Sequence, residues 1–123
     1  VVHIGDSRAY LLREGTASQL TSDHSWLNEQ VSAGLLTPEE AATSELRHII
    51  TRSVGFEREV QADLITVHVN PGDAFLLCSD GMCNYFETEE IAELARDHYY
   101  SELPQVCTDL ALERGGDDNI TVV

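Results

Sequence analysis

Lysine is absent from this sequence, and its seven basic residues, all arginine, stand against 22 aspartates and glutamates. The formal net charge at pH 7 is therefore −15. A chain with so few cations has no basic patch that could neutralise the phosphates of a nucleic acid, so we expect no nucleic-acid partner. Part of the acidic excess is solvated surface, but such an excess also suits the binding of divalent cations.

Cysteine is scarce, and long apolar runs are missing. The three cysteines, Cys78, Cys83 and Cys107, are odd in number and show no CxxC spacing, which is typical of unpaired thiols in a reducing compartment. No apolar run approaches the length of a membrane span, and no signal-peptide pattern opens the chain. These absences predict a soluble, cytoplasmic protein with no membrane segment in this chain.

The length of 123 residues suits one domain with a real core, but it is short for a complete enzyme built on two sheets. The apolar run Val1-Val2-His3-Ile4 opens the chain, and Val122 and Val123 end it inside another run of strand type. We therefore expect an incomplete domain, with missing partner strands or self-association through exposed strand edges.

The pattern of apolar residues and turn formers predicts one layered α+β unit. Thr37-Pro38-Glu39-Glu40 has the residues of a capping box and predicts a short helix through Ala42. The run 74–78 is the most apolar and is expected to form the central strand. The other expected elements are two strands within 1–12 folded about Gly5-Asp6-Ser7, a helix from about 26 to a stop at Gly34, a strand over 63–69, and helices over 89–98 and about 102–114.

Three short acidic segments each lie beside an apolar run: Gly5-Asp6-Ser7-Arg8, Ser79-Asp80-Gly81 and Gly116-Asp117-Asp118-Asn119. Asp80 follows one strand-like run, whereas Asp118 precedes another. If these two strands are antiparallel neighbours, both carboxylates lie at the same edge of the sheet, where Asp6 could join them. Carboxylates that close repel one another unless a cation lies between them, and an oxygen-only ligand set suits Mg²⁺ or Mn²⁺.

The alternative is that these residues only form turns, because Asp and Asn side chains bond the local backbone and tolerate left-handed conformations. Each segment taken alone favours that interpretation. Three such segments at strand ends favour a shared metal site.

Five motifs in this order resemble the carboxy-terminal part of the metal-dependent protein phosphatases, the PPM or type 2C family. They are HIGDSRAYLL (3–12), LTSDHS (20–25), ITRSVG (50–55), GDAFLLCSDGM (72–82) and ERGGDDNITVV (113–123). The segment GLLTPEEA is similar to the helical flap of bacterial members. The resemblance covers the whole chain and identifies residues 1–123 as a partial phosphatase domain with a flap at about 24–55.

The resemblance implies an α+β fold in which two antiparallel β-sheets pack face to face between layers of helices, with a binuclear Mg²⁺ or Mn²⁺ centre at one edge. Asp80 and Asp118 match the catalytic metal ligands, and Gly81 and Asn119 match the residues beside them. Asp6 matches the acid that holds a third, weaker ion together with Asp80. Arg8 is expected to form a structural ion pair with Asp6 or a neighbouring carboxylate, and a substrate contact is the second possibility. Asp117 is interpreted as surface.

The activity that the resemblance implies is hydrolysis of phosphoserine and phosphothreonine on proteins by a metal-activated water. Phosphorylated proteins are then the partners, together with a Ser/Thr kinase whose substrates they are. A related hypothesis is a bacterial regulator phosphatase with one dedicated anti-anti-sigma-like partner. A hypothesis of a different class is a non-catalytic pseudophosphatase that serves as a binding module.

Several features of the family lie outside this chain or differ in it. An Asp-Gly-x-Gly-Gly metal motif and a phosphate-binding Arg lie upstream in the family, so we expect little activity from these residues alone. Asn84 stands where many relatives have Asp, which predicts a weaker third-ion site.

The histidines and one arginine of the flap region have structural interpretations. His24 is interpreted as a capping and packing residue at a helix start rather than a metal ligand. The other four histidines, at positions 3, 48, 68 and 98, show no common spacing. Arg52 is expected to tether the flap near the site, and a contact with the substrate peptide is the second possibility.

Overall fold

The computed structural model describes residues 1–123, apart from the side chain of Arg47. The chain divides into two compact units. Unit 1 contains residues 1–6 and 22–64, and unit 2 contains residues 7–21 and 65–123.

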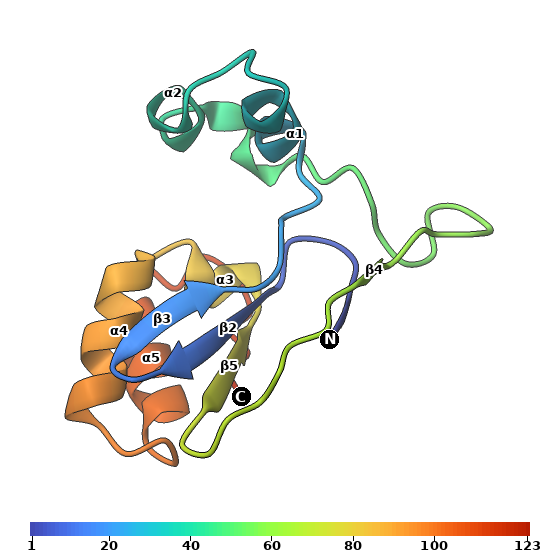
Figure 1. Cartoon of the computed structure of the whole chain (residues 1–123). Helices are drawn as coiled ribbons and strands as arrows, with labels where there is room; N and C mark the ends of the chain where they lie inside the picture. Colours follow the sequence, from blue (N-terminus) through green and yellow to red (C-terminus); the bar gives the residue numbers. More distant parts are fainter. The chain divides into compact units, whose positions relative to one another are not determined.

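Unit 2 contains an antiparallel sheet of three strands, β2 (Arg8–Arg13), β3 (Thr16–Gln19) and β5 (Ala74–Cys78), in the order β3-β2-β5 (Figure 1). A tight turn joins β2 to β3 because Glu14 and Gly15 both take positive φ values, 51° and 76°. Among the three named strands, β2 is the central one. The predicted central position of 74–78 is also confirmed, because β5 pairs with β2 on one side and with residues 121–123 on the other.

Three helices of unit 2 contribute to its core: α3 (Asp80–Cys83), α4 (Thr88–Asp97) and α5 (Leu103–Glu113). One face of the sheet packs against these helices. On that face, Tyr10 of β2 lies opposite Leu76 of β5 in the antiparallel register, and both side chains are buried. The buried cluster consists of Tyr10, Leu76, Cys78, Met82, Cys83, Phe86, Ile91, Leu103, Cys107 and Ala111. At about 1.5–3 kcal/mol for each large apolar side chain removed from water, this cluster is the main stabilising element of the unit.

The three cysteines are buried and free, as their odd number predicted. A hydrogen bond with Cys83, together with burial, raises the pKa of Cys78 above its ordinary value. Burial raises the pKa of Cys107 to about 11. All three thiols are core residues.

A buried carboxylate fixes the connection that leads into β5. Asp73 accepts hydrogen bonds from Arg13 Nε at 2.8 Å and from the Asn70 backbone N–H at 2.7 Å, and its side chain is only 1% exposed. The hydrogen bonds from Arg13 lower the pKa of Asp73 to about 2. Because the pKa is lower in the folded state, the stabilisation is present above the ordinary pKa of 3.8 and is lost as the pH falls from there through about 2.

Asp73→Asn is therefore expected to destabilise the protein at neutral pH, and its difference from wild type should shrink as the pH falls below about 4. Urea midpoints of the two proteins, measured at a series of pH values, test this prediction. The exposed Asp97→Asn serves as the control. A difference that stays constant with pH would contradict the assignment of the ion pair.

Unit 1 contains a two-stranded antiparallel sheet and three short helices. Strand β1 (Val2–His3) pairs with β4 (Asp63–Leu64), so that His3 lies opposite Asp63. The helices are α1 (Trp26–Ser32), α2 (Pro38–Ala42) and η1 (Glu45–His48). The predicted capping box of α2 is present, because Thr37 and Glu40 exchange hydrogen bonds between side chain and backbone.

Three sequence expectations need correction. The two strands within 1–12 exist, but β1 pairs with β4 and β2 pairs with β3 and β5, so they do not form a hairpin about Gly5-Asp6-Ser7. The strand expected over 63–69 is limited to Asp63–Leu64, since a strand persists only where it has a hydrogen-bonded partner. Asp80 does not simply end a strand but begins helix α3.

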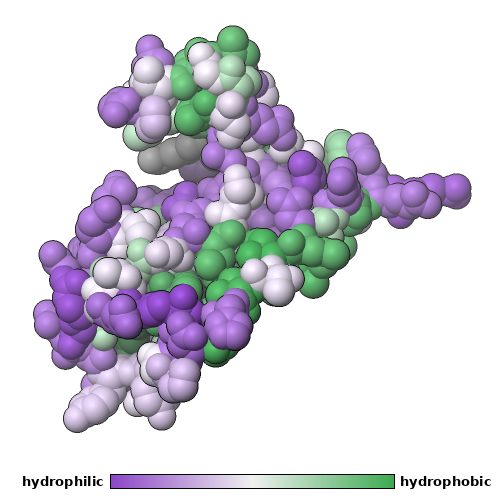
Figure 2. Space-filling model, viewed as in Figure 1, coloured by the Kyte–Doolittle hydropathy of each residue, from purple (hydrophilic) through white to green (hydrophobic). Residues whose placement is uncertain are grey.

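Several large apolar side chains of unit 2 are exposed. Figure 2 shows apolar side chains gathered in the middle of the face in view. Leu77, Val69 and Val123 are 46%, 60% and 70% exposed. Apolar surface gathered in this way commonly marks a site of interaction.

Over the described residues, no helix combines the length and apolar character needed to cross a membrane.

Candidate functional site

The end of β5 and the last residues of the chain lie side by side and antiparallel. The Leu77 N–H donates to Val123 O at 2.8 Å, and the Val123 N–H donates to Leu77 O at 2.9 Å. The pairing continues toward the end of the strand, where the Ser79 N–H donates to Thr121 O at 3.0 Å. The predicted antiparallel arrangement of these two segments is therefore confirmed.

Ser79 and Gly81 hold the acidic segment 79–81 against the acidic segment 116–119. Ser79 Oγ donates to Asn119 O at 3.1 Å and accepts from the Thr121 N–H at 3.0 Å. Gly81 is buried, and a Cβ atom at this position would lie 2.4 Å from Asn119 O. Only glycine allows the two backbones to approach this closely. Asp80 and Asp118 each neighbour this contact, so they lie at the same edge of the sheet.

The carboxylates of Asp80 and Asp118 each accept a hydrogen bond from the backbone N–H of the next residue. Asp80 Oδ1 accepts from the Gly81 N–H at 2.9 Å, and Asp118 Oδ1 accepts from the Asn119 N–H at 2.7 Å. Asp80 is half-buried and Asp118 is exposed. These local bonds orient each carboxylate. The two side chains offer only oxygen atoms as ligands, which suits Mg²⁺ or Mn²⁺ rather than zinc.

Asp117 differs from its neighbour Asp118. Its Oδ2 accepts from Tyr85 Oη at 2.7 Å, and its backbone N–H donates to the same Tyr85 oxygen at 3.2 Å. The side chain and the backbone N–H of Asp117 therefore both bond to Tyr85 at the exposed surface. The interpretation of Asp117 as a surface residue agrees with this contact.

The remaining predicted site residues belong to different units. Asp6 is half-buried and belongs to unit 1, whereas Asp80 and Asp118 belong to unit 2. Arg8 begins β2 in unit 2, and its Nη1 donates to Tyr10 Oη at 3.4 Å. Burial raises the pKa of Tyr10 to about 12, against the opposing effect of Arg8. The expected pairing of Arg8 with a carboxylate stays a prediction.

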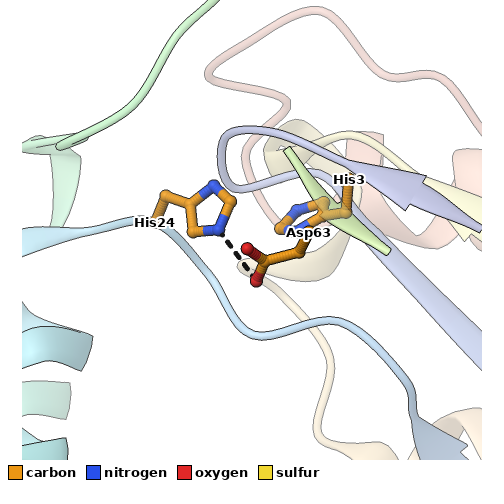
Figure 3. A group of neighbouring side chains, drawn as sticks. All are labelled: His3, His24 and Asp63. Carbon is orange, nitrogen blue, oxygen red and sulfur yellow. Dashed lines mark ion pairs between the residues drawn. The ribbon is translucent and has the colours of Figure 1, made fainter. Parts of the chain in front are cut away.

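A second polar cluster was not found from the sequence: His3, His24 and Asp63 in unit 1 (Figure 3). His24 Nε2 lies 3.2 Å from Asp63 Oδ2, and the rings of His3 and His24 are 4.8 Å apart between centroids. The residue that caps α1 is Ser25, so the interpretation of His24 as a capping residue was wrong. Its packing role holds, because His24 is only 5% exposed. No sequence spacing signals this cluster, because it depends on the pairing of β1 with β4.

Arg52 completes this cluster. Its Nη1 lies 3.1 Å from Asp63 Oδ1 and 3.2 Å from His24 Nε2. The hydrogen bond from His24, and then that from Arg52, lower the pKa of Asp63 below its ordinary value. Arg52 therefore ties residues 51–52 to β4, and it also lines a hollow of about 190 Å³ with Thr51, Ser53, Phe56, Glu57, Val60 and Gln61.

The cluster of His3, His24 and Asp63 offers three ligand-type atoms within 4.8 Å of one another, but its bonding does not suit a metal ion. The Gly5 N–H donates to His24 Nδ1 at 3.1 Å, so the ring carries its proton on Nε2, where it faces Asp63. The guanidinium of Arg52 already supplies a positive charge beside the carboxylate. A divalent cation would have to displace both the proton and the arginine.

Comparison with known proteins gives the class to which the chain belongs. It is 46% identical over 125 residues to the protein phosphatase PhpP of Streptococcus pneumoniae, an alignment that covers 98% of this chain and 49% of PhpP. The structure of the Streptococcus agalactiae serine/threonine phosphatase matches with a TM-score of 0.89 and 42% identity, over 98% of this chain and 50% of that one. The search of protein-family models gave no match.

A third match carries metal ions. The catalytic domain of the serine/threonine protein phosphatase PstP in complex with two manganese ions matches with a TM-score of 0.78 and 38% identity, over 98% of this chain and 50% of that one. These matches define an α+β fold with antiparallel sheets and flanking helices. The chain belongs to the metal-dependent, type 2C family of Ser/Thr protein phosphatases and corresponds to its carboxy-terminal part. It spans about half the length of PhpP.

Proposed function

We propose that this chain supplies the carboxy-terminal half of the active site of a phosphatase that hydrolyses phosphoserine and phosphothreonine on proteins. The observation that supports this proposal best is the close contact of residues 79–81 with residues 118–121, which brings Asp80 and Asp118 to one edge. The family to which the chain belongs carries out this class of reaction. Phosphorylated proteins are then its substrates, and a Ser/Thr kinase acts in the opposite direction.

The residues present fit an oxygen-ligated metal centre. Asp80 and Asp118 would hold Mg²⁺ or Mn²⁺, as main-chain hydrogen bonds already orient one oxygen of each carboxylate. Ser79 and Gly81 both contact the backbone of Asn119. These contacts hold the two carboxylates at the same edge of the sheet. When bound, such ions would lower the pKa of a coordinated water and neutralise charge on the phosphoryl oxygens. The contribution of the chain is thus to position the ligands rather than to react covalently.

The longer protein that contains these residues is the material for the test. Manganese-dependent hydrolysis of p-nitrophenyl phosphate, and then of a phosphothreonine peptide, is the expected result. Absence of turnover in a folded protein would favour the non-catalytic binding module instead. The sequence upstream of Val1 provides a second discriminator, because an Asp-Gly-x-Gly-Gly motif there favours the enzyme.

Asp6 is proposed to hold the weaker third ion. Asp6→Ala is therefore expected to raise the Mn²⁺ concentration for half-maximal activity by about tenfold or more, while activity at saturating Mn²⁺ stays within a few-fold of wild type. Manganese titrations of both proteins measure this, with the exposed Asp97→Ala as the control. Identical titrations for wild type and Asp6→Ala would contradict the assignment of Asp6.

A further inference from the structure

His24 makes two hydrogen bonds to the residue that precedes Asp6. The backbone N–H of His24 donates to Gly5 O at 2.8 Å, and the Gly5 N–H donates to His24 Nδ1 at 3.1 Å. Gly5 takes a φ of +99°, a conformation that favours glycine, so this turn has one specific geometry. The orientation of the peptide that leads into Asp6 is thus set by His24.

The ring of His24 is itself held by its neighbours. Its Nε2 faces Asp63 Oδ2 at 3.2 Å, as the dashed line in Figure 3 shows, and Arg52 donates to the other oxygen of the same carboxylate at 3.1 Å. The ring of His3 packs against it. Because Asp63 accepts from Nε2, the tautomer that leaves Nδ1 free to accept from Gly5 is the stable one.

The backbone of His24 connects this turn to the far end of the flap segment. The Thr51 N–H donates to His24 O at 2.7 Å, and the Trp26 N–H donates to Ile49 O at 2.9 Å. The two ends of residues 24–51 are therefore held together beside Gly5. His24 lies where the flap segment, strand β4 and the turn before Asp6 meet within unit 1.

We infer that His24 is a positioning residue for Asp6: its Nδ1 holds the Gly5 N–H so that the carboxylate of Asp6 points correctly for metal binding. This inference rests on the proposed function, in which Asp6 is a metal ligand. His24 touches neither substrate nor ion in this role. Its effect is on metal affinity, and it is transmitted through one peptide bond.

Two substitutions separate the two ring nitrogens. His24→Asn places an oxygen near the position of Nδ1, so it retains an acceptor for the Gly5 N–H and loses the contact with Asp63. His24→Gln reaches toward Asp63 and loses the acceptor for Gly5. The inference predicts that Mn²⁺ affinity in the longer protein falls by about tenfold in His24→Gln, the low end of losses from outer-shell partners, and by no more than about twofold in His24→Asn.

Binding of Mn²⁺ is measured by electron paramagnetic resonance of the free ion, which does not depend on activity, and hydrogen exchange of the Gly5 amide is measured alongside. We expect the Gly5 amide to lose protection in His24→Gln and to keep it in His24→Asn. Asp63→Ala, at a side chain 41% exposed, is a second variant that loosens the ring and should weaken Mn²⁺ binding in the same direction.

Equal Mn²⁺ affinities in wild type, His24→Asn, His24→Gln and Asp63→Ala would overturn the inference. Equal losses of Mn²⁺ affinity in His24→Asn and His24→Gln would also overturn it, because they indicate a general structural role of the ring. His3→Phe keeps the ring packing and should leave Mn²⁺ affinity unchanged; a loss there would instead indicate a metal ligand. If Asp6→Ala changes Mn²⁺ affinity while His24→Gln does not, this inference fails and the proposed function stands. A wild-type protein without manganese-dependent turnover fails the proposed function itself.

Discussion

Asp80→Asn is expected to lower kcat/KM for manganese-dependent phosphatase activity of the longer protein by about 10³-fold or more. A metal-held water and the neutralisation of phosphoryl charge supply several kcal/mol of transition-state stabilisation, and each 1.36 kcal/mol corresponds to about tenfold in rate. Asparagine keeps the size of the side chain and an acceptor for the Gly81 N–H. The loss therefore reports the missing charge rather than a changed fold.

Asp117→Asn is the matched control for this substitution. It removes one negative charge two residues from Asn119, and the asparagine oxygen can still accept from Tyr85 Oη. Activity within about twofold of wild type is expected, because exposed charges contribute little. Comparable losses in Asp80→Asn and Asp117→Asn would show that net charge, not a ligand at Asp80, governs the activity.

Gly81→Ala is expected to have the second largest effect, on both stability and activity. The added Cβ would meet the backbone oxygen of Asn119 at 2.4 Å, so one of the two backbones must move. Overpacking in a buried position costs about 1–3 kcal/mol of unfolding free energy. The movement also separates Asp80 from Asp118, so activity should fall even at temperatures at which the variant is folded.

Urea unfolding and manganese-dependent turnover, measured on the same preparations, test this prediction. Glu93→Ala, at an exposed position of helix α4, is the control and should change both quantities little. Full activity in Gly81→Ala would contradict the claim that the contact between residues 81 and 119 positions the metal ligands.

The parts of the fold with strong local signals could be predicted from the sequence. The helix boundaries at α4 and α5 differ from the expected ranges by one residue at each end, and the capping box at Thr37 is present. The juxtaposition of Asp80 and Asp118 could also be predicted, because each lies at the end of an apolar run and antiparallel strands place such ends together.

The features that the sequence did not predict depend on distant pairing. Strand β1 pairs with β4 across about sixty residues of chain, and neither two-residue strand has a distinctive pattern of its own. The cluster of His24 with Asp63 and Arg52 follows from that pairing, so no local spacing could indicate it. The expectation of a longer strand over 63–69 failed for the same reason, since periodicity reports which face is apolar but not whether a partner strand is present.

The role of the ligands is tested most directly by an anomalous difference map at the manganese absorption edge from crystals of the longer protein grown with Mn²⁺. We expect manganese peaks within bonding distance of the carboxylates of Asp80 and Asp118. Manganese peaks that leave both carboxylates without an ion would contradict it.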